Sequence, residues 1–309
     1  MSEQGNYSVL ILTKNEEANL PYALESNIGR AAETFVLDSG STDRTRDIAE
    51  SMGAKFVHQP WLGFAKQKNW GIDNLPFKTP WVFILDADEV ITPELARELA
   101  EISNKNTCEE DGFYVNRFFV FLGKRINHCG YYPSWNLRFF RKGKARYEER
   151  EVHEHMVVDG KIAYMHGEME HNDRRGMEHY IAKHNQYSTL EAREMLRVKY
   201  GASSTADLHA SFFGGPIERR RWLKEKIWPR LPAKWLMRFL FMYIYRLGIL
   251  DGAVGFHFCF FLAAYEHQIS LKRVEMERTM VAPALKPQRA PTLASPAIPA
   301  MAGGSLAAA

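Results

Sequence analysis

The feature that most constrains this chain is an apolar run that ends in three carboxylates. Residues 81–85 are apolar and strand-like, and they lead directly into Asp86, Asp88 and Glu89. A strand that runs into clustered acids indicates that the acids face a ligand at the C-terminal edge of the strand, which is where open α/β sheets bind their ligands. Oxygen ligands at that edge suit Mg²⁺ or Mn²⁺, ions that typically bind together with a phosphate group. The run therefore predicts a nucleotide-dependent transferase.

The first third of the chain alternates between strand and helix patterns, and this rhythm predicts the fold class. Short connections between alternating strands and helices favour an α/β fold with a mostly parallel sheet and helices on both faces. Beyond it, residues 112–141 are aromatic and β-like, and residues 178–198 are typical of a long helix. The expected early strands are 7–12, 34–37, 55–57 and 81–85, and the expected helices are 16–28, 43–52 and 63–74.

The distribution of charge is more informative than the net charge of +3. Residues 217–246 hold nine Lys or Arg against two Glu, and Trp222, Trp228 and Trp235 lie among them. Tryptophan interleaved with basic residues is typical of a segment at a membrane interface. We therefore expect a partner such as the anionic inner-leaflet surface, and no nucleic acid, for which basic residues would cover the whole domain.

Two apolar runs, 236–245 and 247–265, follow the basic cluster. The second run is nearly long enough to span a bilayer, but Asp251 and His257 interrupt it. We therefore expect a packed helical hairpin that lies on the inner leaflet or dips into it. The alternative is a soluble hairpin that forms a homodimer, because exposed apolar surface marks protein partners as well as lipid.

The remaining composition bounds the domains and the compartment. Cys108, Cys129 and Cys259 show no paired spacing, which predicts neither a disulfide framework nor a zinc site. The polar start lacks a signal-peptide core, so we expect a cytoplasmic protein that is peripheral at the inner membrane. We predict a transferase domain over 1–200, a basic and aromatic helical membrane-associating region over 201–275, and a disordered tail over 276–309.

Polar motifs follow each expected strand in the first third of the chain. They have simple structural alternatives: Thr13 and Glu16 fit a helix capping box, Ser41, Thr42 or Asp43 fit a helix cap, and the acids before Pro93 fit a solvated turn or cap. Their order is more specific than any single motif. In sequence they are Thr13, Asn15 and Glu16, then Asp38, then Lys68 and Asn69 in the third helix, and finally Asp86 and Asp88.

With these motifs in this order, residues 7–171 resemble the family 2 glycosyltransferases of the GT-A fold. Residues 135–141, 152–154 and 246–252 extend the resemblance to about residue 269 and to the subgroup of lipopolysaccharide core-biosynthesis glucosyltransferases. The resemblance implies a metal-dependent, inverting transfer of a hexose from a UDP-sugar donor, with UDP-glucose favoured. The implied acceptor is a glycolipid at the cytoplasmic face, with lipopolysaccharide inner core favoured.

The resemblance also implies roles for individual residues. Asp88 would hold Mg²⁺ or Mn²⁺, and Asp86 would lie near the ribose, the diphosphate and the metal. The other residues expected to bind the nucleotide are Thr13, Asn15, Glu16, Asp38, Lys68 and Asn69.

On the acceptor side, Glu154 is the expected general base and His153 would orient it or the acceptor. A positioned carboxylate that takes the proton of a hydroxyl contributes on the order of 10²–10⁴-fold. The choice of base stays open among several neighbouring acids. These are Glu148, Glu149, Glu151 and Glu154, and the histidines His166, His171 and His179 are further acceptor-side candidates.

Two other functions fit the same sequence. A transferase that loads a polyprenyl phosphate with sugar would use an acceptor that is already an anion and needs no general base. A non-catalytic scaffold at the membrane surface would keep the fold without the chemistry, and the intact pair Asp86 and Asp88 argues against it.

Overall fold

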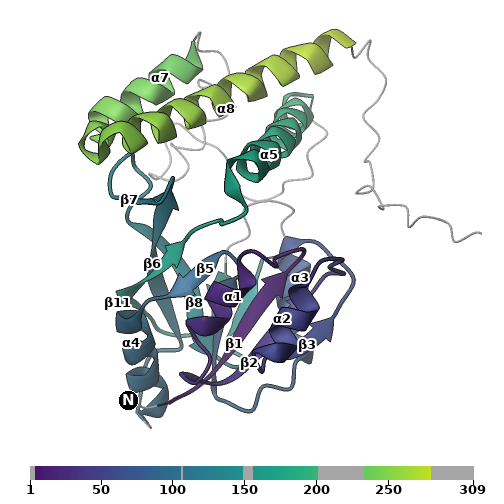
Figure 1. Ribbon diagram of the computed structural model, residues 1–309, viewed down its shortest axis with the longest axis vertical. Coiled ribbons are helices and arrows are strands. Elements are labelled where there is room, and N and C mark those ends of the chain that lie inside the picture. Colours follow the sequence, from purple (N-terminus) through teal and green to yellow (C-terminus); the bar gives the residue numbers. More distant parts are fainter. Residues whose placement is uncertain (1–3, 106, 149–155, 201–232, 280–309) are drawn as a thin grey trace, which may run out of the picture.

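The computed structural model describes residues 4–105, 107–148, 156–200 and 233–279. A sheet with its covering helices forms one part of the molecule, and a layer of helices from the C-terminal part of the chain lies above it (Figure 1). The strands β6, β7 and β11 reach from the sheet toward this helical layer (Figure 1).

Four parallel strands form one half of the sheet. They are ordered β3-β2-β1-β4, so the first strand in the sequence lies between the second and the fourth. This half confirms the parallel sheet and the strand positions expected from the sequence. The strands are β1 (Gly5–Thr13), β2 (Ala31–Asp38), β3 (Lys55–His58) and β4 (Trp81–Asp86).

The other half of the sheet is mixed. β8 pairs antiparallel with both β4 and β6, whereas β6 pairs parallel with β11 and β11 pairs antiparallel with β5. The expectation of a mostly parallel sheet therefore holds only for the first four strands. The aromatic segment 112–141 folds back on itself through short turns, which permit only antiparallel neighbours. Its strands and their partners are β5 (Glu89–Ile91), β6 (Gly112–Phe121), β7 (Lys124–Ile126), β8 (Ser134–Arg141) and β11 (Ile162–His171), with β9 (Ala145–Tyr147) and β10 (Met156–Val158) as a separate pair.

Helices cover both faces of the sheet, as expected. Side chains of α1, α2 and α4 share one buried cluster with Val9 and Phe83, and α3 shares another with Leu10 and Ile84. Successive strand residues point to opposite faces, so neighbouring apolar residues can fill both clusters. The helices are α1 (Leu20–Glu25), α2 (Thr45–Ser51), α3 (Phe64–Asn74) and α4 (Pro93–Asn104).

The structure corrects the capping roles expected from the sequence. No helix begins at Thr13, because it ends β1 and its hydroxyl donates to Asp38 at 2.9 Å. The N-cap of α2 is Arg44, which makes no side-chain cap, and the N-cap of α4 is Thr92, which accepts a hydrogen bond from Leu95. Thr13 and Ser41 are therefore used for contacts between loops, whereas Asp43 does bond the start of α2, because its carboxylate accepts the Thr45 N–H at 3.0 Å.

The helical layer consists of α5 (Gly176–Lys199) and residues 234–279, which we call the helical hairpin. In the hairpin, α7 (Lys234–Leu240) continues into a π-helical turn (Phe241–Tyr245), and a 3₁₀ turn (Gly248–Asp251) leads into α8 (Gly252–Thr279). α8 packs against α5 through Ala192, Tyr265 and Ile269. α5 thus packs with the hairpin, although the predicted domain boundary at residue 200 would group it with the sheet.

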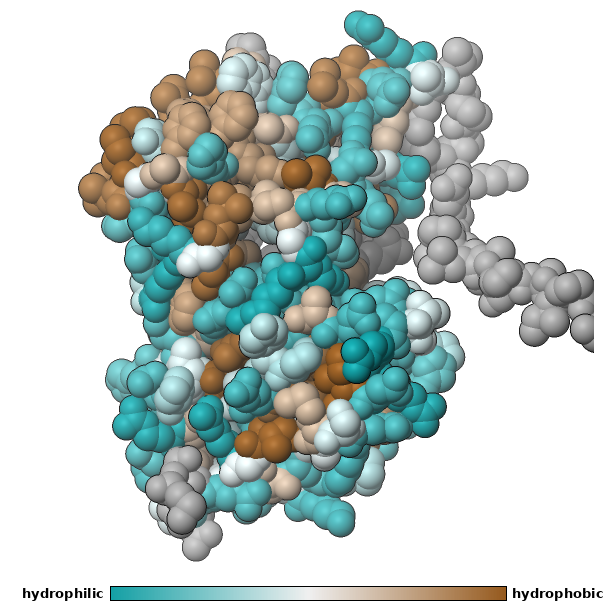
Figure 2. Space-filling model, viewed as in Figure 1, coloured by the Kyte–Doolittle hydropathy of each residue, from teal (hydrophilic) through white to brown (hydrophobic). Residues whose placement is uncertain are grey.

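The helical hairpin exposes much apolar surface, which forms a brown area over α7 and α8 in Figure 2. Residues 248–279 contain a window with a mean hydropathy of 1.5, of which 44% is buried within the molecule. This helix is long and apolar enough to cross a membrane, but the buried core helix of a soluble protein passes the same test. The basic residues 217–230 and the predicted tail beyond residue 279 lie outside the described residues. The exposed side chains of the hairpin are Trp235, Leu236, Met237, Leu240, Phe241, Ile244, Tyr245, Leu247, Ile249, Leu250, Phe256, Phe260, Leu271 and Val274.

Candidate active site

The ends of three parallel strands bring the predicted polar residues to one edge of the sheet. The register pairs Thr13 of β1 with Asp38 of β2, and Leu12 of β1 with Asp86 of β4. Because the strands run in the same direction, their last residues lie side by side. The sequence order of the motifs is thus converted into a spatial cluster beyond the carboxyl ends of β1, β2 and β4.

Asp38 is almost fully buried and organises the loop after β2. Its carboxylate accepts hydrogen bonds from the backbone N–H groups of Gly40 and Ser41, both at 2.7 Å, and from the Thr13 hydroxyl. Gly40 has a φ of +96°, a conformation that glycine adopts without strain. Asn15 fastens the same loop, since its side-chain oxygen accepts the Thr42 N–H at 2.8 Å. Together these contacts fix a rigid polar turn.

Two arginines neutralise the acids at the end of β4. Arg138 of β8 is buried and donates to Asp86 at 2.7 Å and to Glu89 at 2.8 Å, while Arg117 of β6 lies 3.1 Å from Glu89. Burial would raise the pKa of Asp86, but the charges of Arg138 and Lys68 outweigh it and hold that pKa well below its usual range. The pKa of Arg138 is raised well above its usual value because the two acids outweigh its burial. Asp86 is therefore ionised at neutral pH.

Asp88 lies between groups from β11 and α5. Its carboxylate is 3.6 Å from Nδ1 of His171 and 3.9 Å from Nζ of Lys183, which is also 3.8 Å from Asp173. Asp88 is only 8% exposed and Glu89 is fully buried, which rules out the solvated turn considered from the sequence. Nδ1 of His171 is buried and has no hydrogen-bond partner among the residues that the structure describes.

Glu16 connects the loop after β1 to the segment after β11. Its carboxylate accepts from Asn19 at 2.9 Å and from Arg175 at 2.8 Å, and Arg175 also pairs with Asp173 at 2.7 Å. Burial raises the pKa of Glu16 to about 7, although Asn19 and Arg175 act in the opposite direction. The nearby charges of Asp88 and Asp173 raise that pKa further. This acid therefore changes charge near neutral pH.

The two residues predicted from the third helix have different surroundings. Lys68 lies with its ammonium 4.8 Å from the centre of the Tyr147 ring, and its charge reaches Asp86. Asn69 is buried, and its amide both donates to and accepts from the backbone of Tyr147 at 2.9 Å. In this structure Asn69 therefore anchors β9 beneath the site.

The structure describes only some of the expected acceptor-side residues. His153 and Glu154, with Glu149 and Glu151, lie outside the described residues, whereas Glu148 directly follows β9. His166 is exposed beside Glu98, away from the acids at the end of β4. The pKa of His179 is lowered by burial and by the nearby Arg175, which lies at the start of α5. Of the three histidine candidates, which are all described, His171 is the one that lies directly beside Asp88.

Several site residues were missed by the sequence reasoning, although the sequence holds a signal for some of them. Arg138 interrupts the apolar run of β8, and Arg117 likewise interrupts the aromatic run of β6. A charge inside a buried strand requires a partner of opposite charge, which points back to the acids after β4. The contacts of Asp173, Arg175 and Lys183 depend on how α5 folds back over the strand ends, and no local pattern reveals this.

Comparison with known proteins decides the family. The model of the family described as Glycosyl transferase family 2 matches residues 8–164. The chain belongs to this family. Its members are glycosyltransferases, and the acids after β4 lie within the matched segment.

This family 2 glycosyltransferase is similar along much of its length to curated relatives. It is 34% identical over 196 residues to the lipopolysaccharide core biosynthesis glycosyltransferase LpsC of Rhizobium meliloti, a match that covers 61% of this chain and 71% of that protein. It is 27% identical over 279 residues to an uncharacterised glycosyltransferase of Rickettsia typhi, covering 86% and 88% of the two chains.

Solved structures give weaker likenesses to this glycosyltransferase. Glucosyl-3-phosphoglycerate synthase from Mycobacterium tuberculosis, in a complex with Mn²⁺, UDP and its product, aligns with a TM-score of 0.30 at 22% identity, over 37% of this chain and 44% of that one. Residues 1–349 of S. aureus TarS align with a TM-score of 0.43 at 14% identity, over 88% and 91% of the two chains.

Proposed function

We propose that this glycosyltransferase moves a hexose from a UDP-sugar, with glucose favoured, to a glycolipid acceptor with inversion and with the help of Mg²⁺ or Mn²⁺. The observation that carries the proposal is the cluster at the ends of β1, β2 and β4, where the partly exposed Asp86 lies beside Arg138 and the buried Asp88 lies beside Lys183. Such a site suits a nucleotide diphosphate together with a metal ion, because both signs of charge are already held in place. The relative LpsC supports lipopolysaccharide core as the acceptor.

The strand-end loops are the proposed nucleotide site. We assign Thr13, Glu16, Asp38 and Lys68 to the uridine, and Asp86 to the ribose and diphosphate. Support comes from the rigid turn that Asp38 forms and from the position of Lys68, whose charge reaches Asp86. Asn15 and Asn69 would contribute by holding the loop after β2 and strand β9, since their amides already bind those segments.

The donors around Asp88 fit a divalent ion. Asp88 and His171 would hold the ion, and Asp86 lies on the same edge. The buried Nδ1 of His171 has no hydrogen-bond partner within the described ranges and lies 3.6 Å from the Asp88 carboxylate. Across the described part of the chain, no group of three or more His, Cys, Asp or Glu is arranged to hold a metal. A smaller set suffices, because Mg²⁺ is usually bound by one or two carboxylates plus substrate phosphates and water. When bound, the ion would neutralise charge on the departing diphosphate.

The chain's own cations fit the same chemistry. Lys183 and Arg175 contact Asp88, Asp173 and Glu16, so positive charge stands at the edge before any donor arrives. An anionic diphosphate would compete with the acids for these cations. Glu154 remains the proposed general base for the acceptor hydroxyl, with His153 orienting it.

The helical hairpin is the proposed membrane-binding surface at the cytoplasmic face of the inner membrane. Its exposed apolar side chains gather over α7 and α8 (Figure 2), and apolar patches of this kind mark contact with lipid or protein. A glycolipid acceptor requires the enzyme to work at a membrane surface. The hairpin lies at the end of the molecule toward which β6, β7 and β11 extend (Figure 1).

A donor screen tests the proposed function. Free UDP released from several UDP-sugars would be measured with detergent-solubilised rough lipopolysaccharide, with and without EDTA. We expect UDP-glucose to give the highest rate, a rate that depends on the lipid and falls on chelation. Full activity in EDTA would contradict the role of the metal, and release from no UDP-sugar would contradict the proposed donor class.

A further inference from the structure

The sequence motif 246–252 is not part of the proposed donor site. It forms the bend of the helical hairpin, and its acid, Asp251, is almost fully buried. Asp251 accepts hydrogen bonds from the backbone N–H of His128 and from Nδ1 of its ring, both at 2.9 Å, and from the N–H of Asn127 at 3.3 Å. The carbonyl of Arg246 accepts the Cys129 N–H at 3.0 Å. The motif therefore docks the hairpin onto the loop between β7 and β8.

Two glycines allow this close approach. A Cβ at Gly248 would come within 2.9 Å of the sulfur atoms of Cys129 and Cys259, so only glycine fits between them. A Cβ at Gly130 would come within 2.9 Å of Nε of Arg246, and Gly130 has a φ of +79°. Gly130 thus leaves the space that the Arg246 side chain occupies.

The docking contacts use the backbone of Arg246 but not its guanidinium. No carboxylate among residues 4–105, 107–148, 156–200 and 233–279 lies at ion-pair distance from Arg246. The Arg246 side chain lies beside Gly130, and its guanidinium is 5.9 Å from the centre of the Phe241 ring. By contrast, Arg238 of the same hairpin pairs with Glu266 at 2.9 Å. An arginine without an acid partner retains its full capacity to bind an anion.

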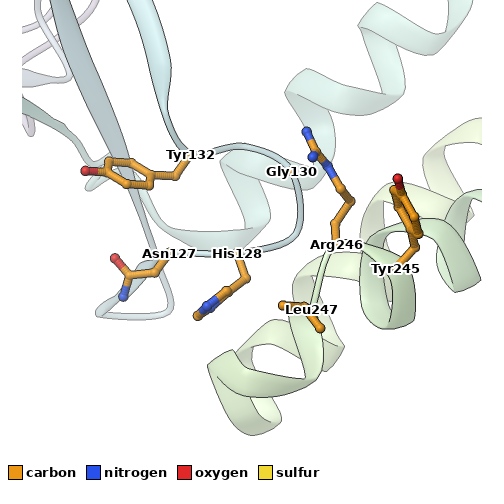
Figure 3. Close-up of a pocket in the computed structure, with 7 residues that line it drawn as sticks. All are labelled: Asn127, His128, Gly130, Tyr132, Tyr245, Arg246 and Leu247. Carbon is orange, nitrogen blue, oxygen red and sulfur yellow. The ribbon is translucent and has the colours of Figure 1, made fainter.

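Arg246 lines a pocket between the loop and the bend of the hairpin. Figure 3 shows the loop that carries Asn127, His128, Gly130 and Tyr132 on one side and the bend that carries Tyr245, Arg246 and Leu247 on the other. The Arg246 side chain runs up beside Gly130, whereas the Tyr132 ring points away from the bend (Figure 3). The cavity measures about 180 Å³, whereas whole small-molecule sites span roughly 300–1,000 Å³. It is too small for a nucleotide sugar and large enough for one anionic group, which the planar fork of arginine matches.

The surroundings of the pocket indicate what carries that anionic group. Tyr245 is 73% exposed, and Leu247, Ile249 and Leu250 of the same bend are also exposed. An anion bound to Arg246 would therefore lie against apolar side chains that face outward. A lipid headgroup combines these two features, since its charged groups lie directly above an apolar layer.

We propose that Arg246 and its pocket bind an anionic group, a phosphate or a carboxylate, on the headgroup of the lipid acceptor. The inference rests on the proposed function, because it takes the acceptor to be a membrane glycolipid. It assigns the motif two tasks: Asp251 docks the hairpin, and Arg246 recognises the acceptor. The pocket would hold the lipid while its sugar hydroxyl reaches the donor site.

A vesicle-binding experiment with the full-length protein tests this proposal without requiring turnover. Phosphatidylcholine vesicles would contain either rough lipopolysaccharide or phosphatidylglycerol, and the variants would be Arg246→Gln, Arg246→Lys and Arg193→Gln. Arg193 is an exposed arginine of α5, so its variant removes the same charge away from the pocket. Arg246→Lys keeps the positive charge and serves as a control for loss of binding caused by misfolding.

We expect Arg246→Gln to weaken binding to lipopolysaccharide vesicles by about tenfold or more, and Arg246→Lys to weaken it less. Arg193→Gln should bind like the wild type, and binding to phosphatidylglycerol vesicles should change little in all variants. Equal losses for Arg246→Gln and Arg193→Gln, or equal losses on both kinds of vesicle, would overturn the proposal. Treating the lipopolysaccharide with hydrofluoric acid removes its phosphate groups and so separates the two sources of the anion. If the treatment abolishes the difference in affinity between the wild type and Arg246→Gln, the bound group is a phosphate. If the difference remains, the bound group is a carboxylate.

A separate measurement distinguishes this proposal from the proposed function. The affinity for UDP-glucose, measured by calorimetry, should be the same in the wild type and Arg246→Gln. If the wild type does not bind any UDP-sugar, the proposed function fails while the vesicle result still decides the role of Arg246.

Discussion

At the donor edge of the sheet the charged side chains are paired and most are buried, whereas the helical hairpin leaves apolar side chains exposed, and among the described residues Arg246 has no acid partner. Asp86 lies beside Arg138 of β8, and Asp88 lies beside His171 of β11 and Lys183 of α5. On the hairpin, Arg246 projects into an open pocket beside Tyr245. The difference fits two kinds of ligand. A compact donor with a charged diphosphate suits a site whose charged side chains are already held in place. A lipid suits an apolar surface that becomes buried only when it enters the membrane.

The sharpest way to break this comparison is at Asp88. Replacing Asp88 with Asn removes the charge that we assign to the metal, and we expect kcat to fall by about 10³-fold. The fold should remain intact, because the variant keeps the size of the side chain. The rate of UDP release measures the expected fall in kcat, and the circular dichroism spectrum shows whether the fold remains intact.

The matched control for this variant is Asp159→Asn. Asp159 is highly exposed and follows β10, not one of the strands β1, β2 and β4 that form the donor edge. Its contact with Lys144 is a surface pair at 3.8 Å. The Asp159→Asn variant should release UDP at the same rate as the wild type. Normal activity in Asp88→Asn would show that the buried acids serve stability alone.

Arg138 tests whether the donor edge is held together by its charges. Replacing Arg138 with Met breaks its buried pair with Glu89 and removes the partner of Asp86, and breaking a buried pair in this way costs roughly 3–5 kcal/mol. We expect a loss of about 3 kcal/mol in the free energy of unfolding, measured in urea. Arg146→Met, which breaks the exposed pair with Asp73, should cost under about 1 kcal/mol. Similar losses in both variants would contradict the distinction between buried and exposed charge.

The hairpin offers the opposite test. Ile244 and Leu250 are exposed on it, and changing both to Ser should weaken binding to anionic vesicles by about tenfold or more because apolar area no longer enters the lipid. Val157 and Ile162 are also exposed but lie on β10 and at the start of β11. Changing this second pair to Ser should leave vesicle binding unchanged, and if both pairs behave alike, the hairpin has no special affinity for membranes.

Glu16 gives the smallest expected effect and tests the electrostatics of the donor edge through pH. Its pKa is raised from 4.5 to about 7 by burial. Between these values the unfolded chain releases a proton that the folded protein keeps, so stability falls as pH rises toward 7. Relative to Glu16→Gln, the wild type should therefore lose a few degrees of Tm between pH 5 and pH 8.

The exposed Glu101 of α4 provides the comparison for this titration. Its Gln variant should follow the wild type across the same pH range. A constant difference between Glu16→Gln and the wild type would show that Glu16 does not titrate near neutral pH.

The parallel half of the sheet was predictable from the sequence, and so was the place where its acids meet. Each strand is a local apolar run, and parallel strands bring their carboxyl ends to one edge, so the positions of Asp38 and Asp86 follow from local patterns. The mixed half was not foreseen, because the order of β8, β6 and β11 depends on long-range pairing. The predicted helix 16–28 proved to be only Leu20–Glu25, since Glu16 and Asn19 are drawn into contacts with Arg175 and Asp173.

The donor edge was predicted with Lys68 as its one cation, and the structure adds Arg138, Arg175 and Lys183 beside the acids. His171 was expected on the acceptor side, yet it lies beside Asp88 because β11 pairs with β5, which places it opposite Glu89. That pairing joins segments far apart in the sequence, and no motif spacing encodes it. The roles of His153 and Glu154 stay predictions.

The most direct test of the donor site is a crystal structure of the protein with UDP and Mn²⁺, using anomalous scattering to locate the metal. We predict one manganese peak beside the carboxylate of Asp88 and Nδ1 of His171, with the diphosphate of UDP bound to the same ion. A manganese ion and diphosphate bound together away from the ends of β1, β2 and β4 would contradict the account.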